Sequence, residues 1–270
     1  MAKPEKKKYP HLKNALLFFF GLLLCLLIYE VIALSTNQLF LPEFFKTLGT
    51  MFSLLGTQTA WISLGWSLLR IIISFSISGL LGIVLGLLSG YFPSMGKVLR
   101  PGITILRSLP TIAVLLLLVV FVPHFSLYVV GLALFPVIYQ ATFEGSSRIY
   151  KTFEYDLLLK GRRHWLSNIT RIIFPLSMDY ILLGFIQALG MGFKVEIMSE
   201  TFAYNSNYQG LGKIIKMYSD NLEYEKMVAY VLLAIITSLI LDGLLLLVKK
   251  QVEKKIGISK EENSTDLVLK

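Results

Sequence analysis

The chain has 270 residues, of which 55% are hydrophobic and 16% are charged, and its mean hydropathy is +0.67. A water-soluble domain has about a quarter of its residues charged, so this composition excludes an ordinary soluble domain. Apolar runs of about 20 residues match the hydrocarbon thickness of a bilayer, whereas a membrane β-barrel would show short alternating segments. The composition therefore predicts an all-α, polytopic membrane protein. A single cysteine, Cys25, excludes a disulfide within one chain.

Six apolar runs predict six transmembrane helices, at about 15–34, 69–90, 103–122, 125–143, 177–198 and 227–248. The basic N-terminal stretch resembles the start of a signal peptide. The apolar run behind it is too long for a signal peptide and lacks a cleavage site, so we interpret it as an uncleaved first helix. We expect a cytoplasmic tail at 1–14, a transmembrane domain at 15–250 and a second cytoplasmic tail at 251–270.

The basic residues outside these spans are distributed unevenly between the two sides of the membrane. Most of them lie in the tails and in the even-to-odd loops, whereas the opposite loops hold only Lys46, Lys213, Lys216 and Lys226. Lysine and arginine are enriched in cytoplasmic loops. We therefore place both termini and the 144–176 loop in the cytoplasm. The same sorting by membrane side explains the net charge of +9 without nucleic acid as a partner.

The second span carries a ladder of small residues, four positions apart: Ser74, Ser78, Gly82, Gly86 and Gly90. Small residues at this spacing allow two membrane helices to approach closely. We expect this face of the helix to pack tightly against another span. The alternative is small residues scattered on a lipid-facing helix.

Proline occurs within the third and fourth spans, at Pro110 and Pro136. Each proline removes a backbone hydrogen bond and predicts a kink. Kinked helices line cavities, although they also occur in bundles without any pathway.

The fifth span places Gln187, Met191 and Lys194 on one helical face. Polar groups at membrane depth usually face a bundle interior or water, so this face is a candidate translocation path. Lys194 could instead extend to the membrane interface, and the sequence leaves both readings open. For Glu196, Glu200 and Arg70 we expect extension to the outer interface.

No motif for catalysis is present: the sequence contains no HExxH, no GxSxG and no His/Cys cluster with metal-ligand spacing. The stretch NYQGLGKI is similar to a phosphate-binding loop, but Asn207 replaces its first glycine and Ile214 follows the lysine. We expect neither an enzyme nor a cofactor, and ATP hydrolysis would have to come from another chain.

The loop between the fourth and fifth spans has a helical pattern. Residues 152–160 predict a short helix with Thr152 as N-cap, ended by Gly161. A second amphipathic helix is expected over 165–173, with Pro175 marking the break before the fifth span. One interpretation is a segment that lies on anionic lipid. The other is a helix that docks into a cytoplasmic partner.

This loop resembles the cytoplasmic loop of permease subunits of binding-protein-dependent ABC importers, whose pattern is Glu-Ala-Ala, three residues, Gly, nine residues, Ile, one residue, Leu-Pro. Gly161 matches the glycine, Ile172 or Ile173 the isoleucine, and Phe174-Pro175 the closing pair. Tyr155 or Asp156 occupies the glutamate position, depending on the end from which one counts, because the loop is one residue longer than the pattern.

The resemblance extends from about residue 38 to 250. LFLPEFFKTLGTMFSLL, SLLR at 67–70 and LLGIVLGLLSG are similar to the N-terminal half of the nitrate, sulfonate and taurine subgroup. RSLPTIAVLLLL at 107–118 resembles its third span, and Gly210-Leu211-Gly212 the GLG after its fifth span.

The resemblance implies a permease subunit without chemistry of its own, in the plasma or inner membrane. Its partners would be a second permease copy, a cytoplasmic ATP-binding subunit, an extracytoplasmic solute-binding protein and the lipid bilayer. The solute would be a sulfonate, nitrate or a vitamin precursor. The ATPase-coupling residues would be Glu154, Tyr155, Asp156, Gly161, Arg162, Arg163, Trp165 and Pro175. The alternative is a membrane scaffold that binds a cytoplasmic partner without transport.

Overall fold

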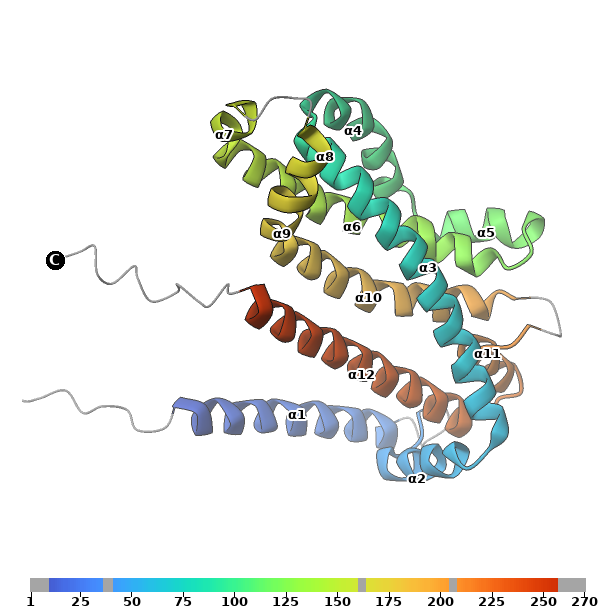
Figure 1. Cartoon of the computed structure of the whole chain (residues 1–270). Coiled ribbons are helices and arrows are strands. Elements are labelled where there is room, and N and C mark those ends of the chain that lie inside the picture. Colours follow the sequence, from blue (N-terminus) through green and yellow to red (C-terminus); the bar gives the residue numbers. More distant parts are fainter. Residues whose placement is uncertain (1–9, 36–40, 160–163, 204–207, 257–270) are drawn as a thin grey trace, which may run out of the picture. The chain divides into compact units, whose positions relative to one another are not determined.

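A computed structural model describes residues 10–35, 41–159, 164–203 and 208–256, and within these ranges the chain forms helices and no strands. The predicted all-α class is therefore confirmed. In chain order the elements are α1 (Pro10–Ser35), α2 (Phe44–Leu55), α3 (Gln58–Tyr91), α4 (Pro93–Ser108), α5 (Thr111–Phe121), α6 (Phe125–Thr152), α7 (Glu154–Leu159), α8 (Trp165–Asn168), the π-helical turn η2 (Ile169–Ile173), α9 (Phe174–Leu176), α10 (Met178–Thr201), α11 (Leu211–Asp220) and α12 (Tyr224–Ile256) (Figure 1).

The described residues include four helices that are long and apolar enough to cross a membrane: Gln58–Tyr91, Phe125–Thr152, Met178–Thr201 and Tyr224–Val252. A fifth crossing is obtained if α4 and α5 count together, and a shorter apolar helix runs over Phe19–Ser35. The chain is thus a polytopic membrane protein, and the predicted number of six spans stays a prediction.

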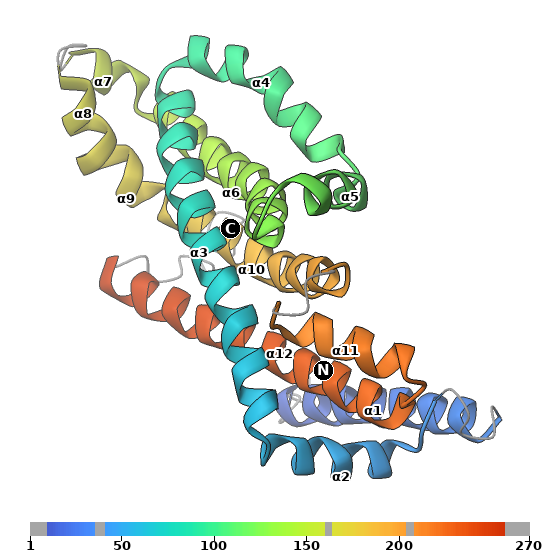
Figure 2. The same cartoon turned by 90° about the vertical axis from the view of Figure 1, so that its right-hand side faces the viewer.

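The predicted third span, 103–122, with its kink at Pro110, is not one helix but two. The chain bends by 87° between α4 and α5, at Leu109 and Pro110 (Figure 2). Pro110 has no N–H to donate and precedes the first turn of α5, where such a donor is not required. The kink predicted at Pro110 is therefore a complete break, whereas Pro136 lies inside the uninterrupted α6.

Two boundaries in the 144–176 loop also differ from the prediction. Thr152 is the last residue of α6 and donates its hydroxyl to the carbonyl of Arg148, so it is not the N-cap of α7. Pro175 lies inside α9 and does not end a helix. The wider π-turn η2 precedes it, and there the backbone N–H of Phe174 donates to the carbonyl of Ile169. Gly161, Arg162 and Arg163 lie outside the described residues.

The chain divides into two compact units, 1–60 with 215–233 and 61–214 with 234–270. In the first unit, the Glu30 carboxylate accepts the backbone N–H of Phe44, at the start of α2, with 3.1 Å between the two atoms. Negative charge at this end of a helix is stabilised by the unpaired N–H groups. Glu225 joins α2 to the start of α12, since it accepts a hydrogen bond from Thr50 and pairs with Lys46 at 2.9 Å.

The second unit is organised around α6 and α10, which lie side by side (Figures 1 and 2). Its core contains Leu134 and Ile138 of α6 and Ala188 of α10, all without exposed surface. Close approach requires glycine here: a Cβ on Gly192 would lie 2.9 Å from the side chain of Leu134.

The small residues of α3 all face α6. The hydroxyls of Ser74 and Ser78 donate to the carbonyls of Leu127 and Gly131, at 3.0 and 2.9 Å. Further along, a Cβ on Gly82 would meet Ile138 at 2.9 Å.

At Gly86 a Cβ would meet Thr142 at 2.6 Å, and at Gly90 it would meet the Cβ of Ser146 at 2.7 Å. The Ser146 hydroxyl donates across the same contact to the carbonyl of Gly86, at 3.1 Å. The two backbones therefore approach along the whole ladder, which suits a membrane, where association depends on close packing.

We expect Gly86→Ala to destabilise the protein by about 1–3 kcal/mol, since the added methyl group overpacks the contact with Thr142. The measurement is thermal unfolding of the purified protein in detergent. The matched control is Gly65→Ala in the same helix, where an added Cβ meets nothing within 4 Å. A Gly86 variant as stable as the Gly65 variant would contradict the packing described.

Candidate functional site

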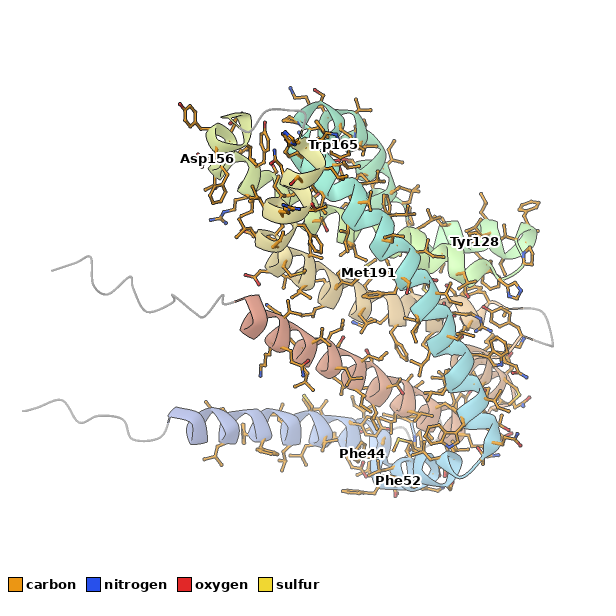
Figure 3. All side chains as sticks on the ribbon, in the orientation of Figure 1. Phe44, Phe52, Tyr128, Asp156, Trp165 and Met191 are labelled. Carbon is orange, nitrogen blue, oxygen red and sulfur yellow. The ribbon has the colours of Figure 1, made fainter. Side chains whose placement is uncertain are left out.

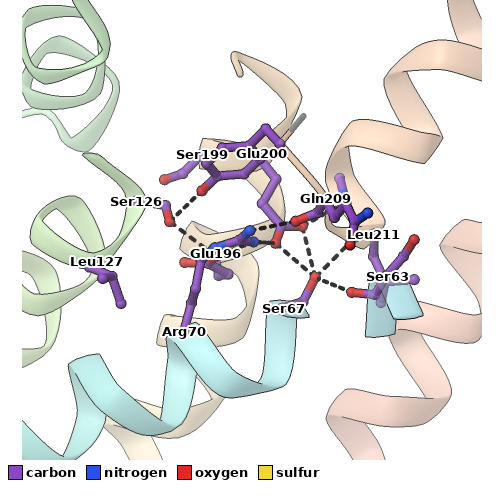
Figure 4. A network of polar contacts seen from close by, with 12 residues as sticks. Ser63, Ser67, Arg70, Ser126, Leu127, Glu196, Ser199, Glu200, Gln209 and Leu211 are labelled. Carbon is purple, nitrogen blue, oxygen red and sulfur yellow. Dashed lines mark hydrogen bonds and ion pairs between the residues drawn. The ribbon is translucent and has the colours of Figure 1, made fainter. Parts of the chain in front are cut away.

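A cluster of buried polar side chains joins α3, α6, α10 and the start of α11 in the second unit (Figure 4). Its charged members are Arg70 of α3, which is 7% exposed, and Glu196 and Glu200 of α10, which have no exposed surface. Glu196 and Glu200 are four residues apart and thus share one helical face. Charged groups are almost never buried unless they are paired, so this cluster is the strongest candidate site.

Glu200 is the centre of the cluster. Its Oε1 atom accepts a hydrogen bond from Arg70 Nη1 at 2.6 Å, and both carboxylate oxygens lie within 2.9 Å of the Ser67 hydroxyl. Oε2 also accepts the backbone N–H of Gly212 at 2.8 Å. A buried carboxylate is tolerated only when its lone pairs are satisfied in this way.

The Gly210-Leu211-Gly212 stretch folds around this carboxylate. Leu211 donates its N–H to the Ser67 hydroxyl at 2.9 Å, and Arg70 Nη2 donates to the carbonyl of Gln209 at 2.5 Å. A Cβ on Gly210 would lie 2.6 Å from Glu200 Oε2, and one on Gly212 would lie 2.7 Å from Glu200 Cβ. Only glycine at both positions lets the backbone reach the carboxylate, which gives the GLG sequence a physical reason.

The second carboxyl group, Glu196, is held more loosely. Its Oε1 atom lies 3.7 Å from Arg70 Nη1 and accepts a hydrogen bond from Ser126 of α6 at 3.2 Å. Tyr208 donates its hydroxyl to Ser126 at 2.7 Å, and its ring lies 4.1 Å from the Arg70 guanidinium carbon. Burial raises the pKa of Tyr208 to about 12, so the phenol remains a donor at neutral pH.

Our expectation that Arg70, Glu196 and Glu200 extend to the membrane interface is wrong, because the three side chains are buried and contact one another inside the protein. A pattern in the sequence could have indicated this. Ser63, Ser67 and Arg70 continue the small-residue ladder of α3 upstream, on the face that carries Ser74. The cluster holds helices together and offers no arrangement for catalysis. Among the described residues, no three His, Cys, Asp or Glu side chains are grouped to bind a metal ion.

The segment from α7 to α9 forms a second candidate site, and its buried side is anchored to α3. Leu157, Ile169 and Ile173 are buried in one cluster with Leu87 and Tyr91 of α3. Asn168 is also buried and donates from Nδ2 to the Tyr91 hydroxyl, at 3.2 Å. The short helices are therefore attached to the longest helix of the chain.

The other side of this segment is exposed. Tyr155 has 76% of its surface exposed and Trp165 has 38%, and the ring centroid of Trp165 lies 5.8 Å from that of Phe92. Glu154 and Asp156 are exposed as well, and Figure 3 shows Asp156 at the free side of α7. Pro175 is half-buried in α9. The segment thus presents an aromatic and acidic surface on a fixed base.

The face of α10 that was predicted to line the translocation path lies on the surface of the single chain. Gln187, Met191 and Lys194 are all exposed, whereas the adjoining Ala188 and Val195, and Glu196 on the opposite side of the helix, are buried (Met191 is marked in Figure 3). The structure brings these three side chains together on one stripe, apart from the buried cluster.

These features are those of a polytopic helical membrane protein with a partly exposed segment between two of its long helices. Comparison with known proteins agrees: the family described as binding-protein-dependent transport system inner membrane component matches residues 78–254, more than half of the chain. The chain belongs to this family, and it is a transmembrane permease of the ABC type.

One relative is the putative aliphatic sulfonates transport permease protein SsuC of Bacillus subtilis (strain 168). It is 26% identical over 194 residues, which cover 70% of this chain and 68% of SsuC. Within the family the chain therefore resembles the sulfonate-type subgroup.

Among solved structures, a chain of the MetNI methionine ABC transporter in inward-facing conformations aligns with a TM-score of 0.55 and 15% identity. The alignment covers 74% of this chain and 99% of the MetNI chain. At this identity the likeness shows the fold alone, and it confirms the permease fold.

Replacing Arg70 by methionine should destabilise the protein by about 3–5 kcal/mol, because Glu200 is then buried without a positive partner. Thermal unfolding in detergent measures the loss. The double variant Arg70→Met with Glu200→Gln should lose less than the sum of the two single variants.

Lys194→Met is the matched control, since it removes an exposed cation from α10 and should change stability by no more than about 0.5 kcal/mol. Equal stability of the Arg70 and Lys194 variants would show that the ion pair does not hold the helices.

Proposed function

We propose that this permease forms the translocation path of an importer for a small anionic solute, pairs with a second copy of itself, and is moved by a separate ATP-hydrolysing subunit that grips the α7–α8 segment. The observation that carries the proposal is the exposed, anchored segment between α6 and α10, within the residues that match the family. The family description, with its dependence on a binding protein, supports a solute-binding partner.

The anchoring of this segment supports its role in coupling. A force on Tyr155 or Trp165 acts on short helices whose buried side packs against α3 through Leu157 and Ile173. η2 and α9 continue into α10 with only Ser177 as a turn between them, and Ser177 and Ile181 keep helical backbone hydrogen bonds across it. Movement of the segment would therefore be transmitted to both α3 and α10. Rocking of packed helices about a central path is the physical basis of alternating access.

The orientation rests on the lysine and arginine distribution. With the termini and the α7–α8 segment in the cytoplasm, the ATP-binding subunit meets the segment on its own side of the membrane. The first and last residues of the chain are then cytoplasmic tails, and the binding protein approaches the opposite face. A second copy is the default partner, because most membrane and soluble assemblies of one chain are symmetric.

For the solute we favour a sulfonate, because the curated relative is named as an aliphatic sulfonates permease. The stripe of Gln187, Met191 and Lys194 supports an anion: it combines an amide, a thioether and one cation on an exposed face of a membrane helix. A polar stripe that the single chain leaves uncovered suits either a water-filled path or the contact with a second copy.

The coupling role predicts that Tyr155→Ala lowers both solute uptake and ATP hydrolysis by the assembled transporter about tenfold, the effect of losing roughly 1.4 kcal/mol of contact energy at one exposed aromatic anchor. Gly161→Pro should uncouple transport in the same way while membrane insertion is retained. The assay is sulfonate uptake and ATPase activity in proteoliposomes. Tyr128→Ala, an exposed tyrosine on the first turn of α6, is the control and should leave both activities unchanged.

Cysteine labelling tests separately on which side of the membrane the α7–α8 segment lies. In a Cys25→Ser background, Asp156→Cys provides one thiol on α7. A membrane-impermeant maleimide should label it only after the cells are permeabilised. Labelling in intact cells would place the segment outside and overturn the proposal.

Lys194→Ala should raise the KM for alkanesulfonate uptake about tenfold, as expected for the loss of one charge-assisted contact, while basal ATPase activity is retained. Lys194→Arg keeps the charge and should retain most of the uptake. An unchanged KM for alkanesulfonate uptake in Lys194→Ala would show that this residue does not line the translocation path.

A further inference from the structure

A cavity of about 650 Å³ lies between α4 and α6, beside the end of α3. All of its lining residues belong to the second unit. Its volume is in the range of sites that hold small organic ligands. Tyr139 and Phe143 of α6 line it with two stacked rings, 6.0 Å between centroids. The cavity is separate from the Arg70–Glu200 cluster and from the stripe on α10.

Four cations surround this cavity, and a single acid, Glu154, stands among them. Lys97, Arg100 and Arg107 come from one side of α4, and Lys151 comes from the last turn of α6. None of the four forms an ion pair with another residue in the described part of the chain. Four unpaired cations around one cavity attract an anion strongly.

Ser89 provides an independent indication of a ligand. It lines the cavity, its side chain is 1% exposed, and its hydroxyl has no hydrogen-bond partner among the described residues. A buried hydroxyl without a partner is costly, so such a group usually indicates a missing water or ligand. A phosphate oxygen in the cavity would accept this hydrogen bond.

The arrangement of the cations restricts the kind of anion. Lys97 and Arg107 are ten positions apart on α4, which corresponds to about 15 Å along the helix axis. A small oxyanion held at one end of this row leaves the cation at the other end without a counter-charge. Ile103 of the same helix and the rings of Phe143 and Tyr150 also line the cavity, so apolar surface lies beside the cations. A ligand with several phosphate groups and an apolar body fits both features.

We propose that this cavity binds the headgroup of an anionic phospholipid, and that a headgroup with two phosphates fits it best. Arg100 and Arg107 hold phosphate oxygens, Ser89 donates to one of them, and the first carbons of the acyl chains pack against Phe143 and Tyr150. Basic pockets between membrane helices are known to take such headgroups. This binding site does not depend on which solute the permease carries.

The test is thermal unfolding of the full chain in detergent, with cardiolipin or phosphatidylcholine added. Cardiolipin should raise Tm by about 5 °C at concentrations well above its Kd, and phosphatidylcholine should not. Native mass spectrometry should show retained cardiolipin under the same conditions. The double variant Arg100→Gln with Arg107→Gln should lose most of the rise, and 0.5 M salt should weaken binding by screening.

The control removes the same charge elsewhere: Lys249→Gln with Lys250→Gln, at the end of α12, should keep the full rise. An equal loss in both double variants would show a nonspecific charge effect and overturn the proposal. Inorganic phosphate or an alkanesulfonate that produces the same rise would identify a site for a soluble anion and also overturn it. If the Arg100/Arg107 variant does not fold, Ser89→Ala provides the second test and should lower cardiolipin retention several-fold.

Discussion

The second unit depends on one buried ion pair, between Arg70 of α3 and Glu200 of α10. Both side chains are buried, so each charge needs the other as its partner. Ser67 and the backbone N–H of Gly212 donate further hydrogen bonds to Glu200, and the carbonyl of Gln209 accepts one from Arg70. The pair fixes the distance between two membrane helices and the path of the chain that follows α10. In an apolar environment such a polar contact is specific, because no other position offers the charges a partner.

The small-residue ladder extends this constraint along α3. The ion pair joins α3 to α10 at Arg70, within the first half of α3, and Ser74 to Gly90 bring α3 against α6 from there to its C-terminal end. The cluster under α7 to α9 then fastens the loop to the far end of the same helix, through Leu87 and Tyr91. α3 is therefore attached at Arg70 to the buried charges and at its C-terminal end to the proposed ATPase-docking segment. A rigid helix with these two attachments would carry a movement of the docking segment to the buried cluster. This suits a transporter whose spans rearrange during transport.

Much of this architecture could be predicted from the sequence, because composition and apolar run length determine the class and the positions of most helices. The ladder of α3 was visible because its members share one spacing. The buried cluster was not predicted, because Arg70 lies far from Glu196 and Glu200 in the chain and each of the three looks like a residue at a span end. Only their pairing, supported by Gly210 and Gly212, distinguishes a buried charge from an exposed one. At Pro110 the sequence predicted a kink, and the structure has a complete break. A proline within an apolar run is compatible with either, so the sequence could not distinguish them.

The π-turn at Ile169–Ile173 lies between Gly161 and Pro175, the stretch in which the loop is one residue longer than its family pattern. A turn closed by a bond from Phe174 to Ile169 holds one residue more than an α-helical turn. An extra residue in a regular helix would rotate everything before it by about 100°. The π-turn lies just before Pro175, which has no N–H to pair with a carbonyl of the preceding turn. Ile169 and Ile173, the first and last residues of this turn, are both buried against α3.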